Sequence, residues 1–356
     1  MKKHNFNAGP AILPPSVFRE ASAAVLDFAG GLSILEISHR STEFTKVLDE
    51  TTALIRELLN LPEYYEVLYL SGGASTQFFM TAMNLLDADA RACYIDTGSW
   101  SAKAIKEAKA FGRVEVVGSS KEDGYSYIPK DIQIPTDAAY LHITSNNTIF
   151  GTQFHQLPET SVPIVADMSS DILSRPIDIN RYGLIYAGAQ KNLGPAGVTL
   201  VVVNKEMLGK VSRTIPSMLD YRIHISKQST YNTPPVFPIY VMMLNLRWLK
   251  ENGGLKAVDK RNKEKAAILY SEIDANPLFK GVVTEAADRS LMNVTFRLER
   301  EELTADFLKA CTTAGCVGVK GHRSVGGFRA SIYNAMEKSS VEVLIGVMQE
   351  FSKQRG

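Results

Sequence analysis

The chain has 356 residues, of which 45% are hydrophobic and 22% are charged, as in a globular protein with a sizeable core. The 39 Lys and Arg nearly balance the 38 Asp and Glu, so a general basic field for nucleic acid is excluded and any anion site must be local. No apolar run approaches the roughly 18 residues of a membrane span, and residues 1–15 lack the apolar stretch of a signal peptide. We therefore expect a cytoplasmic protein that binds neither nucleic acid nor membranes.

Short apolar runs alternate with longer amphipathic ones between residues 50 and 205. Apolar residues recur at helical spacing in 51–60, 75–86 and 101–112, which predicts three helices. The predicted strands are 66–70, 91–96, 113–118, 138–144, 162–167, 184–189 and 198–204. This alternation predicts an α/β fold with a mostly parallel sheet and helices on both of its faces.

The C-terminal third has a different pattern. Its predicted helices are 238–254, 255–276, 301–315 and 339–356, and its predicted strands are 291–299 and 327–334. We expect a large domain over 16–254 and a smaller α+β domain over 255–356, with residues 1–15 packed against the smaller one.

The three cysteines, Cys93, Cys311 and Cys316, are too few and too unevenly spaced for a disulfide framework, which favours a reducing compartment. Cys311 and Cys316 have no His or Cys pair at ligand spacing. We therefore expect buried thiols and no metal site.

Ligands of parallel sheets bind beyond the carboxyl ends of the strands, so residues that follow the strands are the candidates for chemistry. The turn in "LYLSGGASTQFF" (68–79) joins a strand to a helix and could hold a phosphate through backbone N–H groups. It matches neither GxGxxG nor the P-loop, because no Lys follows the glycines. A tight turn without a ligand is a nearly equal alternative.

Lys191, in "YAGAQKNLGPAG", follows a predicted strand among small residues. A lone lysine is most often a solvated surface residue, but burial would lower its pKa and free the neutral amine for Schiff-base chemistry. Asp167 ends the neighbouring strand and could either cap a helix or pair with a cationic ligand group; Asp171 and Asp178 are weaker candidates. An amine, an acid and a phosphate turn are together what a phosphorylated pyridine aldehyde requires.

Trp100 offers a flat face for such a ring, although it could equally belong to the core. Two basic clusters complete the candidates: "EISHRSTEF" (36–44) and "VKGHRSVGGFRASIYN" (319–334). Charge runs are usually solvated, but Arg and His among glycines are typical of an anion site.

At these residues the chain resembles the phosphoserine aminotransferases, which belong to the class V aminotransferases and have the fold-type I pyridoxal-phosphate architecture. The resemblance runs nearly end to end. It rests on "FNAGPAILP", "EISHRSTEF", "DMSSDILSRPID", "YAGAQKNLGPAG", "YNTPPVFPIY" and "GHRSVGGFRASIYNA".

For the cofactor, the resemblance implies pyridoxal 5′-phosphate with Lys191 as its Schiff-base lysine and Asp167 as the partner of the pyridine nitrogen. The further cofactor contacts that it implies are stacking by Trp100, a hydrogen bond from Thr148, and phosphate binding by Gln190, Ala74 and Ser75. Several relatives carry Gly-Arg where this chain has Ala74-Ser75, so the turn has no positive charge.

For the substrates, the resemblance implies Arg329 as the clamp for the α-carboxylate. It places His39, Arg40, His322 and Arg323 around the substrate phosphate or side-chain carboxylate. Asn232 and Thr233 would reach the cofactor phosphate of a neighbouring subunit, so a homodimer with shared active sites is expected.

The implied reaction converts L-glutamate and 3-phosphohydroxypyruvate into 2-oxoglutarate and O-phospho-L-serine. The related step on phosphohydroxythreonine in vitamin B6 synthesis is also open. The alternatives are a carbon–sulfur lyase such as a cysteine desulfurase, which would need a mobile cysteine, and a cofactor-binding protein without activity. A Rossmann-type dehydrogenase is disfavoured because GxGxxG is absent.

Overall fold

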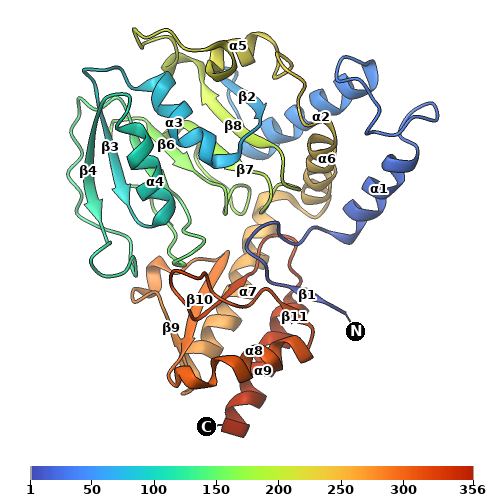
Figure 1. Cartoon of the computed structure of the whole chain (residues 1–356), viewed down its shortest axis with the longest axis vertical. Coiled ribbons are helices and arrows are strands. Elements are labelled where there is room, and N and C mark those ends of the chain that lie inside the picture. The colour runs from blue at the N-terminus through green and yellow to red at the C-terminus, as the bar shows by residue number, and fades with distance from the viewer. Residues whose placement is uncertain (1, 356) are drawn as a thin grey trace.

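A seven-stranded sheet forms the centre of the larger part of the computed structural model, which describes residues 2–355 (Figure 1). Its order is β2 (Tyr65–Leu70), β8 (Thr199–Asn204), β7 (Tyr182–Gly188), β6 (Ile164–Asp167), β5 (Leu141–Thr144), β3 (Arg91–Asp96) and β4 (Arg113–Ser119). Only β8 runs antiparallel to its neighbours in this sheet. The predicted mostly parallel sheet is confirmed.

Helices cover both faces of this sheet, as predicted. One face carries α3 (Gly73–Leu85), α4 (Ser99–Ala108) and α5 (Tyr221–Ser226); the other carries α1 (Pro15–Leu26), α2 (Thr42–Leu59) and α6 (Val236–Glu251). Strand β7 shows the reason: Leu184 and Tyr186 enter one hydrophobic cluster, while Ile185 and Ala187 enter the other. A strand buried on both faces is apolar throughout, because successive side chains point to opposite sides.

Helix α2 begins at Thr42, well before the predicted start at residue 51. Ser41 caps it by accepting a hydrogen bond from the Phe44 backbone N–H (3.2 Å). Phe44 and Val47 then bury the same face as Leu54. A serine cap followed by apolar residues at helical spacing is the signal that could have located this start. Helices α1 and α5 were not predicted.

The smaller C-terminal part is α+β, as predicted. Its antiparallel sheet has the order β12 (Phe328–Ser331), β10 (Asn293–Leu298) and β9 (Phe279–Gly281). The helices are α7 (Gly254–Ala275), α8 (Thr304–Thr313) and α9 (Lys338–Arg355). The last residue of the predicted helix 339–356 lies outside the described residues. Short 3-10 helices lie at Ile179–Arg181, Lys205–Met207, Ser217–Leu219, Ala286–Asp288 and Glu301–Leu303.

The N-terminal segment lies beside this C-terminal part (Figure 1). Strand β1 (His4–Asn5) pairs in parallel with β11 (Cys316–Val317), and Phe6 is buried in the C-terminal hydrophobic cluster. Helix α7 contributes to two clusters, with Leu255 in the cluster of the large sheet and Leu269 in the C-terminal one. This helix therefore connects the two parts.

No helix within residues 2–355 combines the length and the apolar character needed to cross a bilayer.

Candidate functional site

A cavity of about 230 Å³ lies at the carboxyl ends of the parallel strands. Seven of the residues singled out from the sequence line it: Ala74, Ser75, Trp100, Thr148, Asp167, Gln190 and Lys191. They come from five separate strand ends, loops and helix starts, which the strand order of the sheet brings to one edge.

The Lys191 amine lies inside this cavity. Its Nζ donates to Thr148 Oγ1 at 2.6 Å. Desolvation by the surrounding protein lowers the pKa of Lys191 to about 8, while the charge of Asp167 acts in the opposite direction. A substantial neutral fraction is therefore present near physiological pH, which is what a nucleophilic or basic amine requires.

Asp167 ends β6 and is buried. Ser169 donates to its Oδ1 through both the backbone N–H (3.0 Å) and the hydroxyl (2.7 Å), and the same hydroxyl accepts from the Gly188 N–H (3.1 Å). Burial raises the pKa of Asp167, and the Ser169 hydrogen bonds and the Lys191 charge oppose that effect. Within residues 2–355 no protein donor bonds to Oδ2, so this oxygen is available to a cationic group in the cavity.

The two weaker carboxylate candidates form hydrogen bonds with protein groups outside the cavity. Asp171 is buried and accepts hydrogen bonds from Ser145 Oγ and from Gln153 Nε2 (3.1 Å). Asp178 caps a 3-10 helix by accepting from the Asn180 N–H (3.1 Å). Asp167 is the carboxylate that lines the cavity.

The turn between β2 and α3 provides backbone N–H groups. Gly72 and Gly73 have φ angles of +96° and +67°, and α3 begins at Gly73. A Cβ on Gly72 would lie 1.9 Å from Thr76 Oγ1, so the turn requires glycine there. The first N–H groups of a helix have no intrahelical acceptor and attract anions.

Two buried polar atoms of residues that line the cavity have no hydrogen-bond partner among residues 2–355. They are Trp100 Nε1 and Thr144 Oγ1. Unpaired buried polar groups are rare and costly, and they are most easily explained by a ligand that completes their hydrogen bonds.

Arg329, on β12, and Lys191 both form a hydrogen bond to Thr148. Arg329 Nη1 donates to the Thr148 backbone oxygen at 3.1 Å, and its Nε is buried without a partner among the described residues. Burial lowers the pKa of Arg329. The C-terminal part thus brings a guanidinium to the edge of a cavity built by the large sheet.

Further positive charges surround His322. Burial lowers the pKa of His322, and Arg329, Arg323 and Lys103 lower it further. Lys103 was not among the residues predicted from the sequence. It lies one helical turn after Trp100 on α4, and its Nζ is 4.5 Å from the centre of the Trp100 ring. The i, i+3 spacing from Trp100 was the signal that could have found it.

Within residues 2–355, seven predicted residues do not line the Lys191 cavity of their own chain. Three of them, His322, Arg323 and Arg329, belong to the cationic group described above, and the other four are His39, Arg40, Asn232 and Thr233. His39 and Arg40 lie in the turn before α2; His39 is buried with Nε2 unpartnered, and Arg40 is exposed. Asn232 and Thr233 line a separate cavity of about 160 Å³, which also contains Thr76 from the start of α3.

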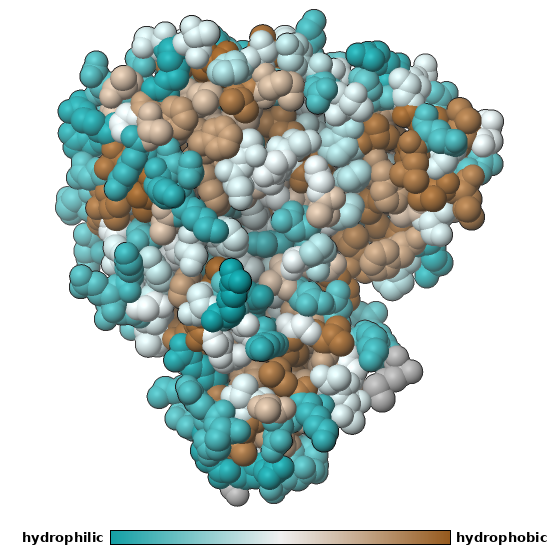
Figure 2. All heavy atoms as spheres, viewed as in Figure 1, coloured by the Kyte–Doolittle hydropathy of each residue, from teal (hydrophilic) through white to brown (hydrophobic). Residues whose placement is uncertain are grey.

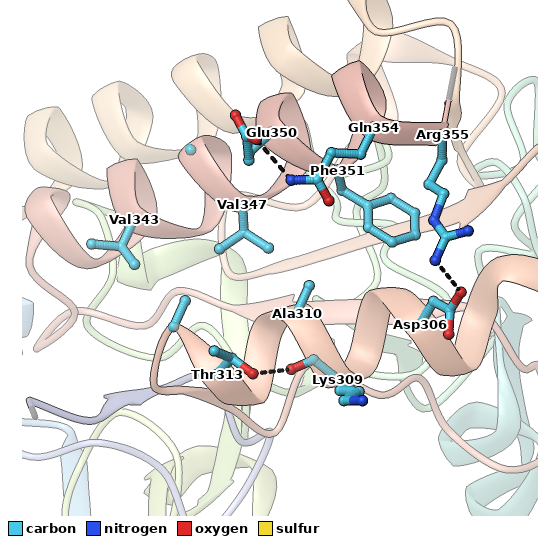
Figure 3. A pocket seen from close by; sticks show the side chains of 12 residues that line it. Asp306, Lys309, Ala310, Thr313, Val343, Val347, Glu350, Phe351, Gln354 and Arg355 are labelled. Carbon is cyan, nitrogen blue, oxygen red and sulfur yellow. Dashed lines mark hydrogen bonds and ion pairs between the residues drawn. The ribbon is translucent and has the colours of Figure 1, made fainter.

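A larger cavity, of about 610 Å³, lies elsewhere, between α8 and α9 (Figure 3). Ala310 and Val347 face each other across it, and the Arg355–Asp306 ion pair (2.9 Å) closes one end. None of the predicted site residues lines this cavity within residues 2–355. We therefore base the functional assignment on the smaller Lys191 cavity.

The model of the family described as aminotransferase class-V matches residues 3–344. The chain belongs to this family. It is 59% identical over 356 residues to the phosphoserine aminotransferase of Phocaeicola vulgatus, with 99% of each chain covered.

Solved structures show the same fold. The phosphoserine aminotransferase from Bacillus circulans subsp. alkalophilus superposes with a TM-score of 0.96 at 49% identity, covering 100% of this chain and 99% of the other. The pyridoxal-phosphate-bound phosphoserine aminotransferase from Trichomonas vaginalis gives 0.93 at 37% identity, covering 98% and 100%. The fold-type I architecture is confirmed.

Proposed function

We propose that this protein is a pyridoxal-phosphate-dependent aminotransferase that converts L-glutamate and 3-phosphohydroxypyruvate into 2-oxoglutarate and O-phospho-L-serine. The observation that carries the proposal is the Lys191 cavity, which combines an amine of lowered pKa, a buried carboxylate and a phosphate-type turn beside a cationic cluster. The printed names of the close relatives support the same reaction.

The residues of the cavity fit pyridoxal 5′-phosphate. Lys191 would bond its aldehyde carbon, and Asp167 Oδ2 would pair with the pyridine N–H. Trp100 would stack on the ring, and Thr148 would hydrogen-bond it. The unpartnered Thr144 hydroxyl would gain a partner. Ala74, Ser75 and Gln190 would hold the phosphate.

When bound, pyridoxal 5′-phosphate supplies an aldehyde for amino groups and an electron-withdrawing pyridine ring. The neutral Lys191 Nζ, once free, accepts the proton from the substrate α-carbon. The Thr148 hydroxyl, 2.6 Å from Nζ, orients the amine. The Asp167 carboxylate keeps the pyridine nitrogen protonated, because a negative charge in a buried site favours a cation next to it.

Arginine and histidine would recognise the anionic groups of the substrates. Arg329 would bind the α-carboxylate, which both amino acids share. His322 and Arg323 would bind the second anion, which is a phosphate in one substrate and a carboxylate in the other. His39 and Arg40 would join them from a partner subunit.

We propose that two copies form a homodimer with shared sites. Asn232 and Thr233 lie in a cavity next to the phosphate turn but outside that of Lys191, and would serve the partner's cofactor phosphate. Figure 2 shows apolar surface gathered over α1 and the loop that follows it. Leu26 is 80% exposed and Leu35 63%, in the segment just before His39. Apolar patches of this kind support a protein–protein interface.

The predicted domain limits, 16–254 and 255–356, remain a proposal, supported by separate hydrophobic clusters around the large and the small sheet. The cytoplasmic location is also a proposal. It is supported by three cysteines that are all free. Activity on phosphohydroxythreonine stays a prediction.

The carbon–sulfur lyase alternative receives no support from the thiols. Cys93, Cys311 and Cys316 are all buried. Burial raises their pKa values to about 11, 12 and 11 respectively. A buried thiol of raised pKa is a poor nucleophile.

The test is a visible spectrum of the protein loaded with pyridoxal 5′-phosphate and then given O-phospho-L-serine. The cofactor band should bleach, and 2-oxoglutarate should restore it. A band that forms and ignores O-phospho-L-serine would keep the cofactor site and reject the substrate. The absence of a band would reject both.

A further inference from the structure

A buried lysine that the proposed reaction does not use lies on α7. Lys265 is 2% exposed, and its Nζ donates to the backbone oxygens of Ile332 (2.9 Å) and Tyr333 (2.7 Å). No carboxylate within residues 2–355 bonds to this amine. Lysines are almost never fully buried without such a partner, so this position calls for a specific explanation.

The amine fits its two acceptors without a counter-ion. Burial, with a smaller contribution from the charge of Arg261, lowers the pKa of Lys265 to about 7. A large share of the side chain is therefore neutral at physiological pH. A neutral amine has two N–H groups, one for each carbonyl oxygen, and the cost of burying a charge is avoided.

The segment that Lys265 holds, residues 332–334, contacts the loop of the Schiff-base lysine. The Asn334 backbone N–H donates to Asn192 Oδ1 (3.0 Å), and Asn192 follows Lys191 in the chain. Asn262, one turn before Lys265 on α7, donates to Asn334 Oδ1 (2.9 Å). Two residues of one helix thus fix this segment.

The same segment directly continues β12, the strand that carries Arg329. Arg329 Nη1 and Lys191 Nζ both donate to Thr148, at its backbone oxygen and its hydroxyl. The distance between the guanidinium and the amine therefore depends on the path of residues 332–334 between them.

We propose that Lys265 is a positioning residue: by holding the carbonyl oxygens of Ile332 and Tyr333, it sets Arg329 at the distance from Lys191 that an amino-acid carboxylate requires. This inference rests on the proposed role of Arg329.

The test compares steady-state kinetics and cofactor binding of the holoenzyme with those of three variants. Lys265→Met keeps an unbranched side chain, one atom shorter, and removes the amine donor from both carbonyl oxygens, so that the Tyr333 oxygen keeps only the Met336 backbone N–H (2.9 Å). The KM values for O-phospho-L-serine and L-glutamate should rise about tenfold, with the dissociation constant of pyridoxal 5′-phosphate changed less than about twofold. Lys265→Gln has a side chain as long as that of Met but keeps N–H donors, and it should give an intermediate KM.

Tyr270→Phe is the matched control on the same helix. It removes a buried hydrogen bond to the Ser290 backbone oxygen (2.9 Å) that does not involve residues 332–334. Its KM should stay at the wild-type value even if its melting temperature falls as far as that of Lys265→Met.

An equal rise of KM in Tyr270→Phe, or a wild-type KM in Lys265→Met, would overturn the proposal. If Lys265→Met does not fold, Lys265→Gln decides alone: a raised KM with an intact cofactor band supports positioning, and an unchanged KM refutes it. A lack of transamination by the unmodified protein would instead refute the proposed function.

Discussion

Lys191 owes its chemistry to the atoms around its amine. The side chain itself is ordinary, but the cavity wall removes water from Nζ, while Asp167 supplies a compensating charge. The resulting pKa of about 8 reflects mainly these two effects, with smaller contributions from Arg329, which lowers it, and Asp171, which raises it. A substitution that changes either the desolvation or the nearby charge should shift the pKa of Lys191, so single substitutions can test it.

Cofactor-free protein should capture pyridoxal 5′-phosphate at a rate that rises with pH to a plateau, with a midpoint near 8. Only the neutral amine attacks an aldehyde, and Lys191 is protonated below its pKa and neutral above it. Asp167→Asn should move the midpoint down, because the carboxylate raises the pKa of Lys191. Stopped-flow absorbance measures the rate. A midpoint near 10.5, the ordinary lysine value, would contradict the desolvated site.

Lys191→Ala should abolish turnover, because it removes the amine proposed to hold the cofactor and to act as the base. The loss should be at least about 10³-fold in kcat. A coupled assay of 2-oxoglutarate formation measures it, and circular dichroism of the variant checks that the fold is intact. Normal transamination by this variant would reject the assignment.

Arg329→Ala should raise the KM of every amino-acid substrate by about 10- to 100-fold, since charge-assisted hydrogen bonds contribute about 1.5–3 kcal/mol. Arg40→Ala and Arg323→Ala should impair O-phospho-L-serine and L-glutamate more than alanine, because only the first two carry a second anion. Kinetics with all three amino acids separate the roles. Equal losses for all three in the Arg40 and Arg323 variants would refute this division.

At the scale of elements, the phosphate turn is shaped by the start of α3. Gly72 combines a positive φ with the close approach of Thr76, and Gly73 opens the helix with its N–H groups unpaired. The turn has no positively charged side chain at positions 74 and 75, so its affinity for phosphate must come mainly from backbone geometry.

Gly72→Ala should weaken cofactor binding by at least about tenfold, because a Cβ 1.9 Å from Thr76 Oγ1 forces the turn to move. Gly124→Ala is the control: Gly124 also has positive φ (+65°), but a Cβ there meets nothing within 4 Å. Both variants should lose about 1–2 kcal/mol of stability to backbone strain. Fluorescence titration with pyridoxal 5′-phosphate should then separate them, and equal affinities would show that the turn does not hold the phosphate.

At the scale of the whole molecule, two features of the single chain lack an explanation: four predicted site residues that lie outside the Lys191 cavity and an exposed apolar patch. His39, Arg40, Asn232 and Thr233 lie outside the Lys191 cavity of their own chain, as described above. The exposed apolar side chains of α1 and its following loop, Phe18, Leu26, Leu32 and Leu35, lie close to His39 in sequence. A second copy of the chain would account for both features.

Leu26→Glu with Leu35→Glu should convert the proposed dimer into monomers, because two charges would have to be desolvated in the interface. We expect the dimer dissociation constant to rise at least about 100-fold, measured by sedimentation velocity, with loss of activity. Val116→Glu, at an exposed apolar position on β4, is the control and should leave the mass unchanged. A wild-type protein that sediments as a monomer would contradict the proposal.

The sequence alone determined the alternation of strands and helices, because periodic burial is a local property of the chain. Strand β3 was predicted at its observed limits, 91–96, and the apolar runs ending at Asp167 and before Lys191 placed both residues at strand ends. The motif resemblance added the family.

The tertiary structure alone decided which of these residues meet. Thr148 bonds both Lys191, 43 residues away, and Arg329, 181 residues away. Lys103 joins the charges around His322 because α4 packs beside β3. Sequence periodicity carries no information on such contacts, since they depend on strand order and on how the two parts of the chain pack. For the same reason, only the folded chain revealed that the predicted Asn232 and Thr233 lie in a different cavity from Lys191.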